Sequence, residues 1–191
     1  MSTLTNVTIG LRSVDLDSAP ERALWALDRD ALQDRSQPPL ASPRRLTTLQ
    51  KAAVEHHECG HAFAAFKFGA SSISVKSRDD GTGICTCDKI EDLQHAIVYH
   101  LSGPVSESLY NPAASRRFVD GKSYDFMAAR IAIEAFNKQQ MWPVITCQRA
   151  AETAVEFVKK HWERIGDLAL ALSSAGELDD HSVRIFASCG T

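Results

Sequence analysis

The residues best suited to chemistry are His57, Glu58 and His61, which form an HExxH motif with the sequence HECGH. On a helix, positions four apart lie on one face one turn apart, so both imidazoles can bind one metal ion. Neutral imidazole is a preferred zinc ligand, and a carboxylate beside the metal can take a proton from an attacking water. The motif predicts a Zn²⁺ cofactor held by His57 and His61, with Glu58 as the catalytic general base.

A catalytic zinc site needs a third protein ligand and an open fourth position. A metzincin would have glycine and histidine where this chain has Ala64 and Lys67, which excludes that class. Five carboxylates and two imidazoles downstream could complete the site: Glu91, Glu107, Asp120, Asp125, Glu134, His95 and His100. Spacing alone does not choose among them.

Three cysteines and a further histidine lie near the motif, and we interpret them as structural residues and not as metal ligands. Cys85 and Cys87 alternate on a predicted strand, and no second Cys or His pair is spaced to complete a tetrahedral site, so we interpret them as core or surface thiols. Cys59, two residues from each motif histidine, is expected to face away from the metal. His56 points about 100° around the helix from His57, and is predicted to lie behind the ligands or at the surface.

The motif lies in a predicted helix over 46–68, where apolar and small residues recur at helical spacing and Gly69 supplies a stop. Alternating patterns at 71–77 and 83–87 flank turn residues and predict a hairpin or small sheet. Further helices are predicted at four places: 90–101, interrupted at SGP and resuming over 105–110; 124–136, capped by Ser123; one long pattern from Thr146 to near Gly176; and 180–186. The predicted fold class is mainly α with a small β-hairpin or sheet (α+β).

Composition narrows the functional class. The 191 residues carry a net charge of −3, with 44% hydrophobic and 24% charged residues, which is close to the average for globular proteins. No apolar stretch approaches the roughly 20 residues that span a bilayer, and the start lacks the layout of a secretory signal. Five cysteines are an odd number, which fits a reducing compartment better than a set of disulfides. Lys and Arg are scattered along the chain and form no basic cluster, which argues against nucleic acid as a partner. We expect a cytoplasmic protein with neither a membrane nor a nucleic-acid partner.

Three segments resemble, in the same order, the peptidase domain of the FtsH family of ATP-dependent zinc proteases. These are VEHHECGHAFAAFKFGA, similar to that family's HEAGHA helix; LSGPVSESLY, similar to LGGRAAEEL; and DGKSYDFMAAR, similar to GASNDLxxA. The aspartate of the last segment is the family's third zinc ligand. The resemblance covers about 46–136 and implies a zincin-like helical peptidase domain with ligands His57, His61 and Asp125, and with Glu58 as the base.

The resemblance has departures in the second and third segments. Pro104 stands where the family has arginine, Ser108 replaces a glutamate, and Tyr124 replaces an asparagine. Glu107 is the remaining member of the family's acidic pair. It could orient a ligand histidine or serve as an alternative third ligand.

Three prolines in SQPPLASPRR indicate an N-terminal arm and linker at 1–45, because proline removes a backbone donor and restricts the residue before it. The resemblance implies that the remaining chain, 46–191, is a helical zinc-peptidase domain. The arm contains a predicted strand at 6–11 and a charged helical piece at 21–34. No stretch fits the phosphate-binding loop GxxxxGK[ST] of an ATPase module. We therefore expect an ATP-independent peptidase standing alone, without a membrane anchor.

The implied activity is that of a zinc metalloendopeptidase, which hydrolyses peptide bonds in unfolded or flexible protein substrates. An extended substrate is expected to pair with the free edge of the predicted hairpin. A homo-oligomer and a separate ATPase partner are both compatible with the resemblance. Two alternatives stay open: a catalytically silent interaction or regulatory protein that retains the scaffold, and a dedicated processing peptidase that cleaves one partner.

Overall fold

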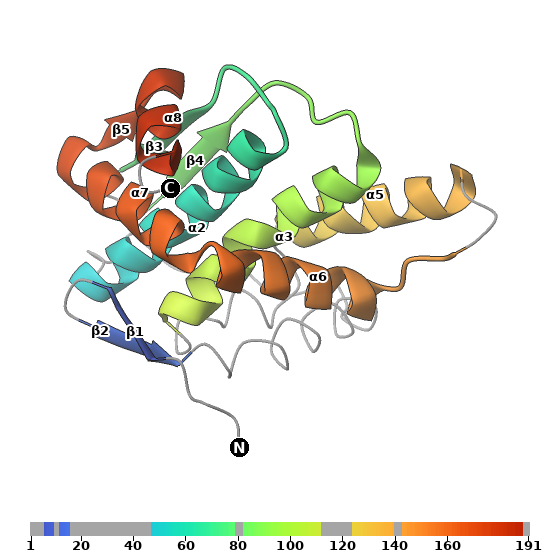
Figure 1. Ribbon diagram of the computed structural model, residues 1–191, viewed down its shortest axis with the longest axis horizontal. Helices are drawn as coiled ribbons and strands as arrows, with labels where there is room; N and C mark the ends of the chain where they lie inside the picture. The colour runs from blue at the N-terminus through green and yellow to red at the C-terminus, as the bar shows by residue number, and fades with distance from the viewer. Residues whose placement is uncertain are drawn as a thin grey trace, which may run out of the picture.

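The computed structural model describes residues 6–9, 12–15, 47–78, 82–111, 124–139 and 143–188. Within these ranges the chain forms six helices and a three-stranded antiparallel sheet, together with a separate two-stranded hairpin (Figure 1). The helices are α2 (Thr48–Lys67), α3 (Leu93–Tyr110), α5 (Tyr124–Gln139), α6 (Cys147–Lys160), α7 (Trp162–Ala175) and α8 (Asp180–Ser188). The strands are β1 (Asn6–Ile9), β2 (Arg12–Asp15), β3 (Ser74–Ser77), β4 (Gly83–Thr86) and β5 (Glu177–Leu178). The mainly helical class with a small sheet is confirmed.

Helix α2 is the central element, and it confirms the helix predicted over 46–68. A capping box starts it: the Gln50 backbone N–H donates to the Thr47 hydroxyl, and the Thr47 backbone N–H donates to the Gln50 side chain. The helix packs against α3, α7, α8, β3 and β4. Because neighbours surround it, twelve of its residues are buried, and the HExxH motif lies inside the molecule.

The sheet has the order β4-β3-β5, and both pairs are antiparallel. The β3-β4 pair confirms the predicted hairpin, with Val75 opposite Cys85. Strand β5 was not expected, because two residues are too few to show an alternating pattern. Within the described residues β4 pairs with β3 alone, so its other edge offers free backbone donors and acceptors.

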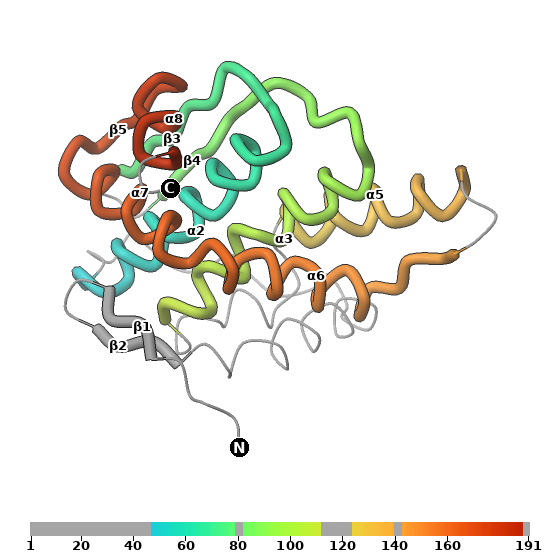
Figure 2. The backbone as a smooth tube through the Cα atoms, in the orientation of Figure 1, coloured from blue at the N-terminus to red at the C-terminus, as the bar shows by residue number. Residues whose placement is uncertain are grey.

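The predicted interruption of α3 at Ser102-Gly103-Pro104 is wrong, because one helix runs from Leu93 to Tyr110. An interior proline costs a helix roughly 3 kcal/mol, since it lacks an N–H and its ring crowds the preceding turn. Burial opposes this cost. Five aliphatic side chains of α3 are buried, each contributing about 1.5–3 kcal/mol, and together they outweigh the proline: Ile97, Val98, Leu101, Val105 and Leu109. Helix α5 runs back beside α3, and α6 packs on it as well (Figure 2).

The long helix predicted from Thr146 to Gly176 is two helices, which meet at His161. Both predicted ends are confirmed: the Arg149 N–H donates to the Thr146 hydroxyl at 3.1 Å, and Gly176 takes a left-handed φ of 75°. At the junction His161 has φ −113° and ψ 14°, which ends α6. Apolar residues recur at helical spacing on both sides of this single residue, so the pattern hides the break.

The remaining elements agree with the sequence where they are described. Helices α5 and α8 confirm those predicted at 124–136 and 180–186. Part of the strand predicted at 6–11 is present as β1, which pairs with β2. The helical piece predicted at 21–34 and the Ser123 cap lie outside the described residues. The division at residue 45 stays a prediction. None of the helices in the described part of the chain is long and apolar enough to cross a membrane.

Candidate metal centre

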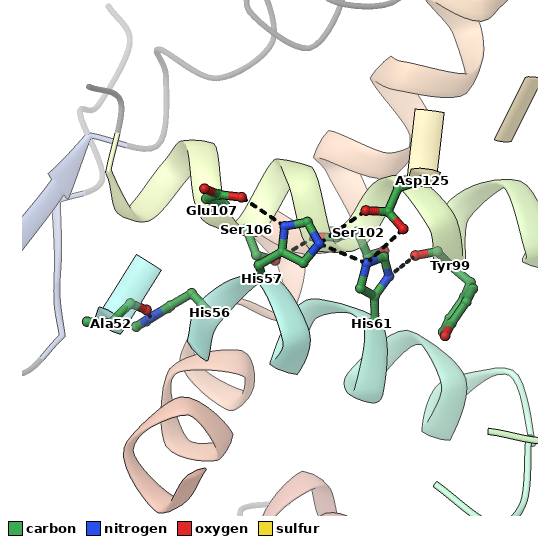
Figure 3. Close-up of polar contacts among 9 residues, drawn as sticks. All are labelled: Ala52, His56, His57, His61, Tyr99, Ser102, Ser106, Glu107 and Asp125. Carbon is green, nitrogen blue, oxygen red and sulfur yellow. Dashed lines mark hydrogen bonds and ion pairs between the residues drawn. The ribbon is translucent and has the colours of Figure 1, made fainter. Parts of the chain in front are cut away.

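Two helices bring three ligand atoms to one point. His57 and His61 project from successive turns of α2, and their Nε2 atoms lie 3.2 Å apart. Asp125, in the first turn of α5, places Oδ2 3.1 Å from His57 Nε2 and Oδ1 3.4 Å from His61 Nε2 (Figure 3). The structure thus unites the two motif histidines with Asp125, one of the seven groups that spacing could not rank.

The far nitrogen of each imidazole is already engaged. His57 Nδ1 donates to a carboxylate oxygen of Glu107 at 2.9 Å, and His61 Nδ1 donates to the main-chain carbonyl of Tyr99 at 2.8 Å. These oxygens only accept hydrogen bonds, so a neutral imidazole must carry its proton on Nδ1. The Nε2 lone pairs of both rings then point at each other and at the Asp125 carboxylate. Such a set of converging acceptors is suited to a cation.

The separations fit a tetrahedral ion. Zinc–nitrogen bonds of about 2.0–2.1 Å give a tetrahedral edge of about 3.3 Å, and the two Nε2 atoms lie 3.2 Å apart. Each imidazole has one Asp125 carboxylate oxygen nearby, Oδ2 at 3.1 Å from His57 and Oδ1 at 3.4 Å from His61, and one ligand atom from each of the three residues lies within 4.8 Å of the others. Three protein ligands leave the fourth position open. His57, His61 and Asp125 therefore form a group that could hold a metal ion. Two imidazoles and one carboxylate suit several transition metals, so this donor set does not fix the metal.

Without a metal, a proton serves as the cation at this point. Burial alone would lower the pKa of His57, but hydrogen bonds to Asp125 and Glu107 outweigh burial and raise the pKa to about 10. Burial would raise the pKa of Asp125, yet the neighbouring His61 and His57 bring it well below its usual range. A metal ion has to displace that proton, so metal binding competes with acid.

Glu58 lies beside the ligands at the floor of a cleft. It is buried on α2, and a Cβ atom at Gly83 of β4 would overlap its side chain, so only glycine leaves space there. Burial raises the pKa of Glu58, and the charge of the neighbouring His57 partly opposes this increase. A carboxylate with a raised pKa, next to a metal group, is suited to accepting a proton. Its role as the base stays a prediction.

The cleft has a volume of about 360 Å³, and its walls come from four elements. Its lining residues are His57, Glu58 and His61 of α2, Gly83, Ile84 and Cys85 of β4, Tyr99 and His100 of α3, and Tyr124 and Asp125 of α5. Ile84 and Tyr124 are exposed apolar side chains at its rim. Burial lowers the pKa of His100 to about 4, so this imidazole is neutral at pH 7. Strand β4, which supplies three of these lining residues, is an edge strand of the three-stranded sheet.

Close packing of α2 on α3 fixes the ligands, and the sequence did not reveal it. A Cβ atom at Gly103 would overlap the His61 ring, and one at Gly60 would lie 2.5 Å from the Ser102 carbonyl oxygen. Each helix therefore presents a glycine to the other where they cross. The sequence Gly103-Pro104 predicted a break in α3. In the structure Gly103 instead lies within the helix and leaves space for the His61 ring.

The structure also places most of the other residues considered as a third metal ligand. Glu107 contacts Nδ1 of His57, the position that orients the ring, not the position of a third ligand. His100 lines the cleft, whereas Glu91, Glu134 and His95 do not. Asp120 lies outside the described residues.

The neighbours of the motif gave one correct expectation and one wrong one. Cys59 lies in the core and not in the cleft, as expected. The expectation for His56 is wrong: it is buried in the core, where its ring stacks on Tyr110 with centroids 3.9 Å apart, and Nδ1 donates to the Ala52 carbonyl. A neighbouring helix covers the face that was taken for surface.

Cys85 and Cys87, which the sequence analysis interprets as core or surface thiols, form no disulfide among the described residues. Cys85 and Cys87 share hydrogen bonds with the Tyr99 hydroxyl, and burial raises the pKa of both. Cys85 also forms part of the cleft wall.

Comparison with known proteins does not supply a family. No protein-family model matches the chain, and no curated protein matches it. The function is therefore inferred from the residues of the site, their geometry and their chemistry.

Proposed function

We propose that this protein is a zinc metalloendopeptidase with a zincin-like site. The observation that carries the proposal is the convergence of His57 Nε2, His61 Nε2 and an Asp125 carboxylate oxygen, next to Glu58, in an open cleft. The resemblance of three ordered segments to the FtsH-type peptidase domain supports the same assignment.

The roles follow from what each group contacts. His57, His61 and Asp125 hold the ion, while Glu107 and the Tyr99 carbonyl fix the two imidazoles. The bound ion supplies Lewis acidity, which makes water more acidic and polarises a carbonyl group. Glu58 takes a proton from the attacking water and later delivers it to the leaving amine.

The substrate is proposed to be an extended segment of protein or peptide. Strand β4 lines the cleft and is an edge strand of the sheet, so a substrate that pairs with its free edge would lie close to the metal group. Main-chain pairing needs an extended chain, which favours unfolded or flexible segments. Exposed Ile84 and Tyr124 at the rim favour apolar side chains near the scissile bond.

The test is zinc content and hydrolysis of casein, an unfolded substrate, by the full chain prepared without chelator. We expect about one zinc per chain and cleavage that a chelator abolishes. Asp125→Ala should lose most of the zinc and the activity, because it removes one of three ligands. Asp167→Ala, on the exposed side of α7, is the matched control and should behave like the wild type.

Glu58→Gln separates metal binding from catalysis. The ligands stay in place, so zinc content should match the wild type, while cleavage should fall at least 10²-fold because the base is lost. Glu134→Gln, exposed on α5, is the control. Cleavage that survives in Glu58→Gln would refute the proposed mechanism. Bound zinc without any casein cleavage would favour the silent scaffold or the dedicated processing peptidase.

A further inference from the structure

His100 is a cleft residue to which the roles above give no function. Its half-buried side chain lines the same cleft as the metal group and Glu58. Across the described residues, neither ring nitrogen has a hydrogen-bond or ion-pair partner. Its ring packs edge-on against that of Tyr99, with centroids 5.0 Å apart. By contrast, His57 and His61 have both nitrogens engaged.

Helix geometry places His100 in line with the metal group. His100, Gly103 and Glu107 are three and then four residues apart, so they form one stripe of α3. Glu107 contacts His57, and Gly103 lies against His61. The next position along this stripe, past His61, is His100. Glu58 enters the cleft from α2 beside β4, so the two groups approach it from different elements.

We propose that His100 donates a hydrogen bond to the carbonyl oxygen of the scissile peptide as that oxygen becomes negatively charged. This inference rests on the proposed peptidase function. An imidazole has at least one N–H to donate in either charge state, and no protein group in the described part of the chain accepts it from His100. A donor held in place before the reaction, where charge develops, commonly contributes 10²- to 10³-fold to kcat.

The chemical step balances without a proton from His100. The water oxygen bonds to the carbonyl carbon, a water proton passes to Glu58, and the π electrons of the C=O bond move onto the oxygen that faces His100. The oxygen's electron pair then re-forms the C=O bond as the C–N bond breaks, the C–N electrons stay with nitrogen, and Glu58 returns the proton to the leaving amine. His100 keeps its proton throughout and only stabilises charge.

The test compares three variants of the zinc-loaded full chain. His100→Phe keeps a ring but removes the donor, and His100→Gln keeps an N–H donor in a different shape. His95→Phe, at an exposed position earlier on α3, is the control. The measurements are zinc per chain, kcat and KM on a casein-derived peptide, and Kd by calorimetry for a phosphinic peptide, whose anionic tetrahedral group mimics the attacked carbonyl.

For His100→Phe we expect unchanged zinc, kcat lower by 10²- to 10³-fold, KM within about threefold, and phosphinic-peptide binding at least 10-fold weaker. His100→Gln should recover part of each loss, and His95→Phe should match the wild type. Recovery of kcat and phosphinic-peptide binding in His100→Gln would show that position 100 acts as a hydrogen-bond donor and not only by packing. This variant still tests the inference if His100→Phe folds poorly.

Three results would overturn the inference. Wild-type kcat and phosphinic-peptide affinity in His100→Phe would remove the role of His100 and leave the proposed peptidase function intact. Zinc loss in both His100 variants would make His100 a ligand instead of a donor. If the wild-type chain neither cleaves peptide nor binds the phosphinic peptide, both the peptidase function and the role of His100 fail.

Discussion

The two ligand imidazoles differ in the charge of the acceptor behind them. Glu107 places a carboxylate on His57, whereas His61 donates to a neutral carbonyl. A charged acceptor makes an imidazole more basic and a better metal ligand. If the site binds a metal ion, as proposed, residues that do not touch the ion should therefore share in setting its affinity.

Glu107→Gln tests this contribution. The amide oxygen can still accept from His57 Nδ1, but it carries no charge, so zinc affinity should fall about 10-fold, at the low end of the 10- to 100-fold usual for such partners. Competition with a zinc-binding dye measures the change, and far-UV circular dichroism checks the fold. Glu91→Gln, exposed before α3, is the control. An affinity equal to the wild type would mean that Glu107 does not tune the site.

At the scale of elements, the crossing of α2 and α3 determines where the ligands lie. Gly60 meets the main chain of α3, and Gly103 meets the His61 ring. The two glycines thus face different kinds of neighbour: a carbonyl that cannot move alone, and a side chain that can rotate. Adding a methyl group should have different effects at the two positions.

Gly103→Ala should impair metal binding more than folding, because the new methyl group displaces the His61 imidazole. We expect zinc affinity to fall more than 10-fold, measured by dye competition. Gly60→Ala is the counterpart: overpacking against backbone should lower the free energy of unfolding by about 1–3 kcal/mol, measured by urea denaturation. Normal zinc affinity in Gly103→Ala would show that the ring has other space.

The sequence predicted those features that have local causes. The capping residues Thr146 and Gly176 marked helix ends correctly, because side-chain capping and a left-handed φ depend on nearby residues. The continuity of α3 through Pro104 and the break at His161 were missed. Helix α3 continues through Pro104 because distant segments pack against it, which the local sequence does not show. The break at His161 is hidden because the apolar pattern continues on both sides of it.

The site shows the same division. His57 and His61 follow from spacing on one helix, whereas Asp125 lies 64 residues beyond His61 and was indicated only by resemblance. Two supporting groups had no visible signal. A main-chain carbonyl at Tyr99 has no sequence signature, and Gly103 resembled a helix breaker.

At the scale of the whole molecule, burial of α2 places a histidine in the core. His56 lies between the rings of Tyr110 and Trp162, and among the described residues its Nε2 has no hydrogen-bond partner. Burial lowers the pKa of His56 to about 4 from 6.5. The folded protein therefore resists protonation of His56 in a range where the unfolded chain accepts it.

The sign of the pH effect follows from this difference. Above about pH 6.5 both states leave His56 neutral, and the group has no influence on stability. As the pH falls from about 6.5 to 4, the unfolded chain takes up a proton and the free energy of unfolding decreases, by up to about 3 kcal/mol.

His56→Phe should remove this contribution, because phenylalanine can stack on Tyr110 and does not titrate. Urea denaturation of the metal-free chain between pH 8 and pH 4 should give a shallower loss of stability than in the wild type. His181→Phe, exposed on α8, is the control. Equal slopes in wild type and His56→Phe would mean that His56 is not the group responsible.

Tyr99 offers His61 an acceptor that every amino acid possesses. Substitution at position 99 leaves the carbonyl in place as long as α3 keeps its course, so this half of the site is insensitive to mutation. The acceptor for His57 is a side chain that can be exchanged. Inherited variation can therefore adjust metal affinity in steps through position 107, while the other imidazole stays tied to the helix itself.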